Sequence, residues 1–316
     1  MSSSPPSEEG TTSVAAKPPV TEGEFQRAIK GLDAMQIEEE LSSSLDGTTV
    51  IFKGREKYSL VYVQVKRITK GFEDERVLND VIHEVRMLSK LKHDRIATHL
   101  AWYQTPRHVW VVSEFCAGGS LRDILIHHPL ETDAVKDLIQ DISAGLNYLH
   151  IERGIVHGDL RPESIVLTEN GVAKLSGFSM ARFYQKQTIS YKLDGTRLRD
   201  HLQQYAEYSA PEILLACASS SLRMEGETTI YSDIWTLGIT LFECIIGSPP
   251  FTGTSFFHLF ERIVDDEPSY VREGSSKEFS LAPFLKSLLK KDPVKRLVKE
   301  QLQSAVDALK KDERAL

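Results

Sequence analysis

The hydrophobic pattern of this chain changes its period near residue 116, and this change limits the fold more than any other feature. Before it, Val61, Val63 and Val65 alternate with polar neighbours, which is the period of a half-buried strand. After it, apolar residues between Val135 and Leu149 recur at helical spacing. The pattern therefore predicts an α+β chain with a strand-rich first part and a mostly helical second part.

Other segments agree with this division. One helix is expected over 78–91 within the strand-rich part, and residues 117–121 (AGGSL) read as a flexible joint that leads into a helix. We expect strands at 109–115, 165–167 and 173–175, a loop at 216–226, and helices at 234–246, 256–264, 284–290 and 299–309.

The domain boundaries follow from composition. Residues 1–22 are rich in Ser, Pro and Thr and contain almost no large apolar side chains, so they are predicted to be a disordered tail. We place a strand-rich lobe at 23–116 and a helical lobe at 117–310.

Composition excludes several classes of protein. A net charge of −7 argues against a nucleic-acid binder, which usually has a basic face. The three cysteines are scattered, which argues against a disulfide framework or a zinc site. The most apolar run, Ile234 to Ile246, contains Glu243 and is too short to span a bilayer. No signal peptide is visible, and we expect a cytoplasmic protein.

Two short segments carry the chemistry. Residues 157–164 read HGDLRPES and residues 175–179 read LSGFS. They resemble the catalytic loop H-R-D-L-K-P-E-N and the D-F-G segment of protein kinases. Further matches follow in the same order as in that family: VQVK at 63–66, HEVR at 83–86, APE at 210–212, DIWTLG at 233–238 and KDPVKR at 291–296.

The resemblance extends from about residue 35 to 309 and implies a bilobal protein-kinase fold. It places Asp159 at the position of the catalytic base, here a vestigial one. It also predicts an ion pair between Glu212 and Arg296, and makes Asp233 the residue that braces the catalytic loop. The implied nucleotide contacts are Lys66, Glu84, Gln64, Ser113, Glu114 and Cys116.

The chain departs from the family at the magnesium positions. Gly177 stands in place of the metal-binding aspartate, and Ser164 in place of the metal-binding asparagine. Mg²⁺ prefers hard oxygen donors, commonly carboxylates together with phosphates. We therefore predict no metal site, and phosphoryl transfer should be impaired because metal ions neutralise the charge that develops on the phosphates.

Other departures agree with this prediction. The glycine-rich phosphate loop of kinases aligns with Ser44, Asp46, Thr49 and Ile51, so its glycines are absent and a carboxylate stands near the phosphate position. Gln64 replaces a small residue that lies against adenine. Gly158 replaces the arginine that receives an activation-loop phosphate, so we expect no switching through that residue.

Details of the sequence are similar to the STRAD-type pseudokinases of the sterile-20-like group and, as a second match, to the Fused-related, ULK-type pseudokinases. These resemblances imply a scaffold or allosteric regulator whose partner is a protein kinase or signalling complex. The alternative is a weakly active serine/threonine kinase with an atypical metal site. No cofactor is established, and ATP binding without magnesium remains open.

Overall fold

The computed structural model describes residues 32–44, 47–69, 85, 87–105, 107–183, 201–202, 204–219 and 229–313. These residues belong to two compact units. The first unit falls within Met1–Leu91 and Thr98–Phe115, and the second within Lys92–Ala97 and Cys116–Leu316. The tail predicted at residues 1–22 lies outside the described residues.

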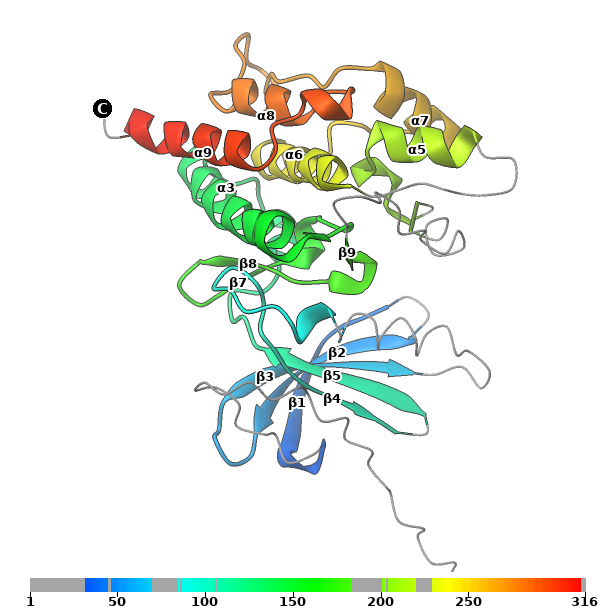
Figure 1. Cartoon of the computed structure of the whole chain (residues 1–316), viewed down its shortest axis with the longest axis vertical. Coiled ribbons are helices and arrows are strands. Elements are labelled where there is room, and N and C mark those ends of the chain that lie inside the picture. The colour runs from blue at the N-terminus through cyan, green and yellow to red at the C-terminus, as the bar shows by residue number, and fades with distance from the viewer. Residues whose placement is uncertain are drawn as a thin grey trace, which may run out of the picture. The chain divides into compact units, whose positions relative to one another are not determined.

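The first unit is built on one antiparallel sheet, drawn in blue to green in Figure 1, with strand order β1-β2-β3-β5-β4. Its strands are β1 (Met35–Ser43), β2 (Thr49–Glu56), β3 (Tyr62–Thr69), β4 (His99–Gln104) and β5 (His108–Glu114). The five-stranded sheet confirms the strand-rich first part predicted from the period-2 pattern. Val61 lies outside β3 and is 55% exposed, so only Val63 and Val65 of the alternating set enter the core.

The two faces of β3 have different roles. Val63 and Val65 pack in a cluster with Met35, Tyr103 and Val112 on one face. Because side chains alternate along a strand, Gln64 and Lys66 lie on the other face, together with Ile68.

Ile68 packs with Val85, Val109 and Val111 on that second face. Val85 comes from the segment predicted to be a helix over 78–91, of which only residue 85 and residues 87–91 are described. This segment therefore contacts the sheet on the face that carries Lys66.

The second unit is mostly helical, as the change of period predicted. Figure 1 shows its long helices, from α3 in green to α9 in red. Two short strand pairs, β6–β9 and β7–β8, complete the unit. The helices are α2 (Leu121–Leu125), α3 (Thr132–Asn147), α5 (Pro211–Ser219), α6 (Ile230–Ile246), α7 (Phe256–Asp265), α8 (Ala282–Leu288) and α9 (Glu300–Glu313). The short strands are β6 (Ile155–Val156), β7 (Ile165–Leu167), β8 (Ala173–Leu175) and β9 (Arg182–Phe183).

One expectation for this unit is wrong. We expected a loop over 216–226, but residues 216–219 form the last turn of α5. Ala216 and Ala218 have high helix propensity, which favours this extension. Residues 220–228 lie outside the described part of the chain.

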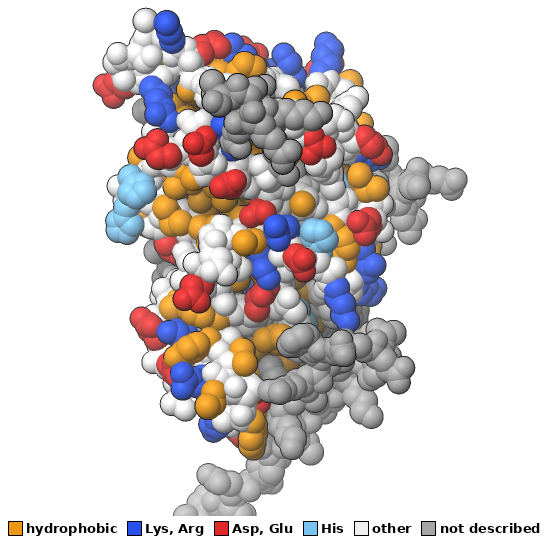
Figure 2. All heavy atoms as spheres, turned by 90° about the vertical axis from the view of Figure 1, so that its left-hand side faces the viewer, with side chains coloured by type: hydrophobic (Ala, Val, Ile, Leu, Met, Phe, Trp, Pro, Cys, Tyr) orange, Lys and Arg blue, Asp and Glu red, His pale blue; other side chains and the backbone are white. Residues whose placement is uncertain are grey.

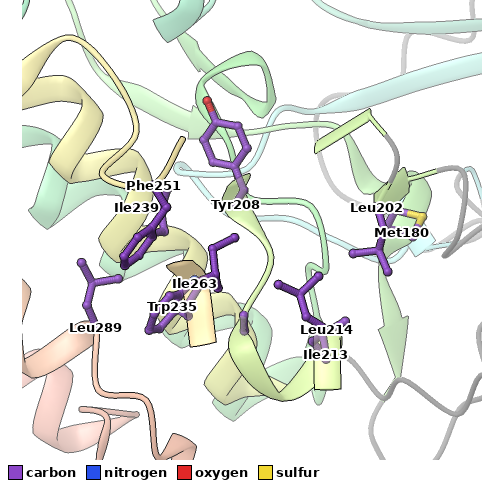
Figure 3. Close-up of a cluster of buried hydrophobic side chains, with 11 residues drawn as sticks. Met180, Leu202, Tyr208, Ile213, Leu214, Trp235, Ile239, Phe251, Ile263 and Leu289 are labelled. Atoms are coloured by element: carbon purple, nitrogen blue, oxygen red, sulfur yellow. The ribbon is translucent and has the colours of Figure 1, made fainter. Parts of the chain in front are cut away.

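Helix α6 is the centre of the second unit and is buried around most of its circumference. It begins at a Thr229 cap, whose hydroxyl accepts a hydrogen bond from the Ser232 amide, and ends at Gly247 in the left-handed region. Trp235 and Ile239 of α6 lie in the hydrophobic cluster drawn in Figure 3. Within the described residues, no helix is both long enough and apolar enough to cross a membrane.

An ion pair fastens α5 to the segment after α8. The Arg296 guanidinium donates to both carboxylate oxygens of Glu212, each at 2.7 Å, and its side chain is fully buried. It also donates to the backbone carbonyls of Tyr231 and Lys290, and it lies 5.0 Å above the Trp235 ring. A buried guanidinium is tolerated because its donors are paired in this way.

We predict that Glu212→Ala lowers the free energy of unfolding by about 3–5 kcal/mol, because it leaves the Arg296 charge buried and unpaired. Chemical denaturation measures this loss. The matched control is Glu278→Ala, which removes the Lys286–Glu278 pair, whose side chains are 43% and 47% exposed. That exposed pair should contribute less than about 1 kcal/mol. Equal losses in the two variants would contradict the structural role of Glu212.

Candidate functional site

The loop at 157–159 is held by one buried carboxylate. Asp233 accepts hydrogen bonds from the backbone amides of His157 and Gly158, each at 2.8 Å. The Nε2 atom of His150 lies 2.8 Å from the same carboxylate, and Asp233 is only 1% exposed. Three partners therefore satisfy this carboxylate, and they set the path of the loop that presents Asp159.

The ring of His157 supports the same loop from within. Its Nε2–H donates to the Ser176 carbonyl at 2.8 Å, and its Nδ1 accepts from the Asp159 amide at 3.3 Å. Burial lowers the pKa of His157, although the nearby Asp233 carboxylate opposes this. The ring is therefore neutral near pH 7. Its hydrogen bond to Ser176 connects the loop at 157–164 to the segment at 175–179.

Asp159 is buried and already paired. Its carboxylate accepts a hydrogen bond from Arg161 Nε at 2.8 Å. Burial is the largest single influence on the pKa of Arg161 and lowers it, but the charge and hydrogen bond of Asp159 together with the Glu163 charge outweigh burial and raise the pKa. Arg161 also pairs with Glu163 at 2.9 Å.

Ser164 and Gly177 are brought together by the fold. A Cβ atom added to Gly177 would lie 3.1 Å from the Ser164 Cβ. The Ser164 hydroxyl donates to the Arg161 carbonyl at 2.9 Å and accepts from the Arg161 amide at 3.0 Å. Its backbone carbonyl accepts from the Ser176 amide at 2.8 Å. Ser164 is 4% exposed, and its polar atoms bond to the backbone of its own unit.

Gly158 permits a close approach of the chain that follows β8. Its φ is +78°, and an added Cβ would lie 2.7 Å from the Met180 carbonyl oxygen. A larger residue at this position would meet both backbone strain and a steric conflict. The absence of a side chain at 158 is therefore required by the position of Met180.

The turn between β1 and β2 uses its own polar groups. Ser44 Oγ accepts from the Thr49 amide at 2.9 Å, and the Gly47 amide donates to the Ser44 carbonyl at 2.9 Å. Gly47 has a φ of +68°. Asp46, the second residue aligned with the phosphate loop, lies outside the described residues.

The residues predicted to contact nucleotide are divided between the two units. Gln64 is the cross-strand neighbour of Ser113, and Lys66 lies on the same face, opposite Val111. Glu114 ends β5, and its carboxylate accepts from the Thr98 amide at 2.7 Å.

Two other predicted contacts are placed differently. Cys116 is buried and begins the second unit, where its carbonyl accepts from the Gly119 amide at 3.1 Å. Glu84 lies outside the described residues, so its nucleotide contact stays a prediction.

A metal-ion cluster is not formed by the described side chains: no three His, Cys, Asp or Glu residues among them come together as ligands. On the face shown in Figure 2, the described Lys and Arg side chains are scattered among Asp and Glu, without one extended basic area.

A family model described as protein kinase domain matches residues 47–306. The chain belongs to the protein kinase family. The HGDLRPES loop and the Gly177 segment of this kinase domain lie within the matched residues.

The curated relatives are named as serine/threonine kinases. The chain is 33% identical over 252 residues to Serine/threonine-protein kinase RUNKEL of Arabidopsis thaliana. This alignment covers 79% of this chain and 17% of that protein. It is 31% identical over 272 residues to Serine/threonine-protein kinase ULK4 of Mus musculus, covering 78% and 19% of the two chains. It is 31% identical over 248 residues to Serine/threonine-protein kinase 36 of Mus musculus, and this alignment covers 78% of this chain and 17% of that protein. The chain thus spans less than a fifth of the length of each of these relatives.

Sequence reasoning missed a charged network in this kinase domain. Arg122 of α2 donates to Glu163 at 2.8 Å, to Glu243 at 2.6 Å and to the Tyr208 hydroxyl at 2.6 Å. Tyr208 in turn donates to Glu243 at 2.6 Å. Burial, together with the Glu243 carboxylate, raises the pKa of Tyr208 well above its usual range, so the hydroxyl keeps its proton. No local pattern marks these residues, because Arg122 and Glu243 are 121 positions apart.

We predict that Gly158→Ala destabilises the kinase domain more than Gly171→Ala. Both glycines have a φ of +78°, but an added Cβ at Gly171 meets nothing within 4 Å. The left-handed backbone alone costs an alanine about 1–2 kcal/mol. Crowding against Met180 should add about 1–3 kcal/mol for Gly158→Ala only. Chemical denaturation of both variants measures the difference, and equal losses would show that the Met180 contact carries no strain.

Proposed function

We propose that this kinase domain is a pseudokinase that acts by binding a protein partner and does not catalyse phosphoryl transfer from Mg·ATP. The observation that carries the proposal is the pairing at Ser164. Its hydroxyl bonds to the Arg161 amide and carbonyl at 3.0 and 2.9 Å, beside a glycine at position 177. The only side-chain oxygen at the two magnesium positions is therefore occupied by the protein itself.

The energetic consequence is large. Electrostatic stabilisation of the transition state is often the largest catalytic contribution, and losing one oxyanion donor costs about 3–4 kcal/mol in a protease. A kinase loses both charge neutralisation and phosphate orientation when its metal is not held. Asp159 cannot replace these effects, because a base needs a positioned and polarised phosphate.

The β1–β2 turn gives a further reason to expect that phosphate groups bind weakly. Amides at the phosphate loop are useful to a nucleotide only when they point toward it, which glycines allow. Here the Thr49 amide bonds to the Ser44 hydroxyl and the Gly47 amide to the Ser44 carbonyl. These two amides would have to leave their partners before they could bind a phosphate.

The resemblance described above is the basis on which we propose a protein partner. The STRAD-type and Fused-related, ULK-type likenesses favour a scaffold or allosteric role toward a protein kinase or a signalling complex. Gly158 supports a partner-controlled role, because the arginine that would receive an activating phosphate is absent and Met180 closes over its position. We place the domain limits of this module at 23–116 and 117–310.

The second candidate is a weakly active serine/threonine kinase. It is favoured by the names of the relatives and by Asp159, whose loop is held in place by Asp233. On this reading, ATP would be held by Lys66, Glu84, Gln64, Ser113, Glu114 and Cys116, and the metal by Asp46, Glu163 or Asp159.

We predict that the melting temperature of the chain does not rise with Mg·ATP beyond any rise with ATP alone. A ligand at one hundred times its dissociation constant stabilises the folded state by about 2.7 kcal/mol, so a magnesium-dependent site would be visible. Transfer of radiolabelled phosphate should remain at background. Magnesium-dependent stabilisation, together with transfer that Asp159→Ala abolishes, would establish the kinase instead.

The control restores the metal ligands. The double variant Gly177→Asp, Ser164→Asn supplies a carboxylate and an amide at the two positions. Aspartate tolerates the left-handed backbone of Gly177, where φ is +73°, better than most residues do. Magnesium-dependent stabilisation that appears only in this variant supports an absent metal site in the natural chain. If the natural chain already shows that stabilisation, the two departures do not matter and the proposal fails.

A further inference from the structure

Arg67 is a charged residue of the first unit that the proposed function does not use. It follows Lys66 in β3, so its side chain lies on the other face of the sheet, with Val65. Its guanidinium lies 5.1 Å from the Phe52 ring and 5.9 Å from the Trp110 ring, one ring on each neighbouring strand. Both distances are typical of cation–π contacts. We call Phe52, Arg67 and Trp110 the arginine stack.

The donors of the arginine stack have no acceptor within the described part of the chain. Arg67 and Trp110 are direct cross-strand neighbours, and the Nε atom of the first and the indole Nε1 atom of the second are buried without a hydrogen bond. The terminal nitrogens of Arg67 are not buried, and they bond to no described residue either. A guanidinium that is oriented by two rings and has open terminal donors is suited to bind a carboxylate.

Arg55 gives the contrast on the opposite face of the same sheet. Its guanidinium also lies over a ring, 4.6 Å from the centre of Tyr62. It donates to the Tyr62 hydroxyl at 2.7 Å and lies 3.7 Å from a carboxylate oxygen of Glu38. The sheet thus gives Arg55 an acceptor and a counter-charge, and it gives Arg67 neither among the described residues. We therefore expect an anionic group from another segment to bind Arg67.

The N-terminal segment of the same chain can supply this group. The described residues begin at Leu32, which packs in the cluster that also contains Phe52 and Trp110. Residues 22–25 read EGEF, so they carry two carboxylates and one aromatic ring. A carboxylate suits the open donors of Arg67, and an aromatic ring suits the two rings beside it.

This segment is long enough to reach the arginine stack. Met35 pairs with Glu56 and Arg67 pairs with Val50, so these two rows of the sheet are six residues apart along β2. Six residues of a strand span about 20 Å. The eight residues from Glu24 to the anchored end of the segment can span about 26 Å when extended.

The charges along the same path are complementary. Glu40 of β1 is exposed and is the cross-strand neighbour of Phe52, so it lies between the anchored end of the segment and Arg67. Arg27 precedes Leu32 by five residues and can face Glu40 at about the same point of the path. The order of charges in the segment therefore matches the order of opposite charges on the sheet.

We propose that residues 22–25 of this chain dock on the arginine stack, with a carboxylate of Glu22 or Glu24 on the Arg67 guanidinium and the Phe25 ring against the aromatic rings. The inference goes beyond the proposed function, because the contact is made within one chain and on the sheet face away from Lys66. It involves neither the loop at 157–164 nor the segment at 175–179.

The endoprotease Glu-C tests the contact on the full chain, because it cleaves after glutamate. The bond after Glu9 is the internal reference, since it lies 23 residues before Leu32. Each rate is divided by the rate for the same bond in a synthetic peptide of residues 1–31. We expect the bond after Glu24 to be cleaved at least tenfold more slowly than the bond after Glu9. Equal normalised rates would overturn the docking.

Two variants of the sheet show whether Arg67 is responsible. Arg67→Met keeps an unbranched stem between the rings and removes the charge, so cleavage after Glu24 should become at least fivefold faster while cleavage after Glu9 stays unchanged. Arg55→Met is the matched control, because Arg55 also stacks on a ring but on the opposite face, and it should leave both rates unchanged. Equal acceleration in the two variants, or no acceleration in Arg67→Met, would overturn the docking.

Photo-crosslinking identifies the surface without changing any residue of the sheet, so it decides the question if Arg67→Met folds poorly. The crosslinker p-benzoylphenylalanine replaces Phe25 and keeps an aromatic ring there. We expect adducts mainly with residues 50–67 and 108–112 of the same chain, mapped by mass spectrometry. Adducts mainly with other residues, or between two copies of the chain, would overturn the docking.

The tail offers a matched pair of charge variants for the crosslinking. Glu22→Gln with Glu24→Gln should lower the yield of these adducts at least fivefold. Glu8→Gln with Glu9→Gln makes the same change of charge and should keep the yield. Equal yields in the two double variants would overturn the role of the carboxylates and the docking with it. None of these measurements uses nucleotide or magnesium, so a failure here is separate from a failure of the proposed function.

Discussion

The buried carboxylate of Asp233 is the contact on which the rest of the site depends. It accepts the amides of His157 and Gly158 and lies within hydrogen-bond distance of His150, all at 2.8 Å. Asp233 lies in the first turn of helix α6, whose N-terminus is capped by Thr229. The helix therefore fixes the position of the Asp233 carboxylate independently of the loop. The loop path then determines where Asp159, Arg161 and Ser164 lie. A buried charge with three well-placed partners is stable, and each partner is fixed in return.

The polar groups of this loop are already hydrogen-bonded within the protein, and this pairing limits the chemistry of the site. The Ser164 hydroxyl is used by the Arg161 backbone, and the Asp159 carboxylate is used by the Arg161 side chain. Arg161 also forms an ion pair with Glu163, and Glu163 pairs with Arg122. Arg122 pairs in turn with the carboxylate of Glu243, whose side chain is 2% exposed. Alternating charges therefore connect the loop to α2 and α6. The groups that the family resemblance predicts at the metal, phosphate and substrate positions are bonded here to one another.

Local patterns predicted much of the fold. The helical period placed α3 and α6 close to their observed bounds, and the short strands at 165–167 and 173–175 match β7 and β8. Strand β4 was not predicted, because His99–Gln104 is one short edge strand with little alternation. The ring of Tyr205 over Arg161 was also beyond prediction, since only the folded chain brings these residues within 3.7 Å. The pairing of Glu212 with Arg296 was accessible from sequence solely because each residue stands in a family motif.

The sequence by itself determined which residue types are present at each motif position: a glycine at 177, a serine at 164, an aspartate at 159. That information is local, and it limits the chemistry because glycine has no side-chain donor to offer. Only the tertiary structure decided what the remaining groups bond to. Arg122 meets Glu243 across 121 positions, and Gly158 meets the Met180 carbonyl, through the packing of separate elements around α6. Such contacts depend on the three-dimensional path of the chain, which no short pattern of residues records.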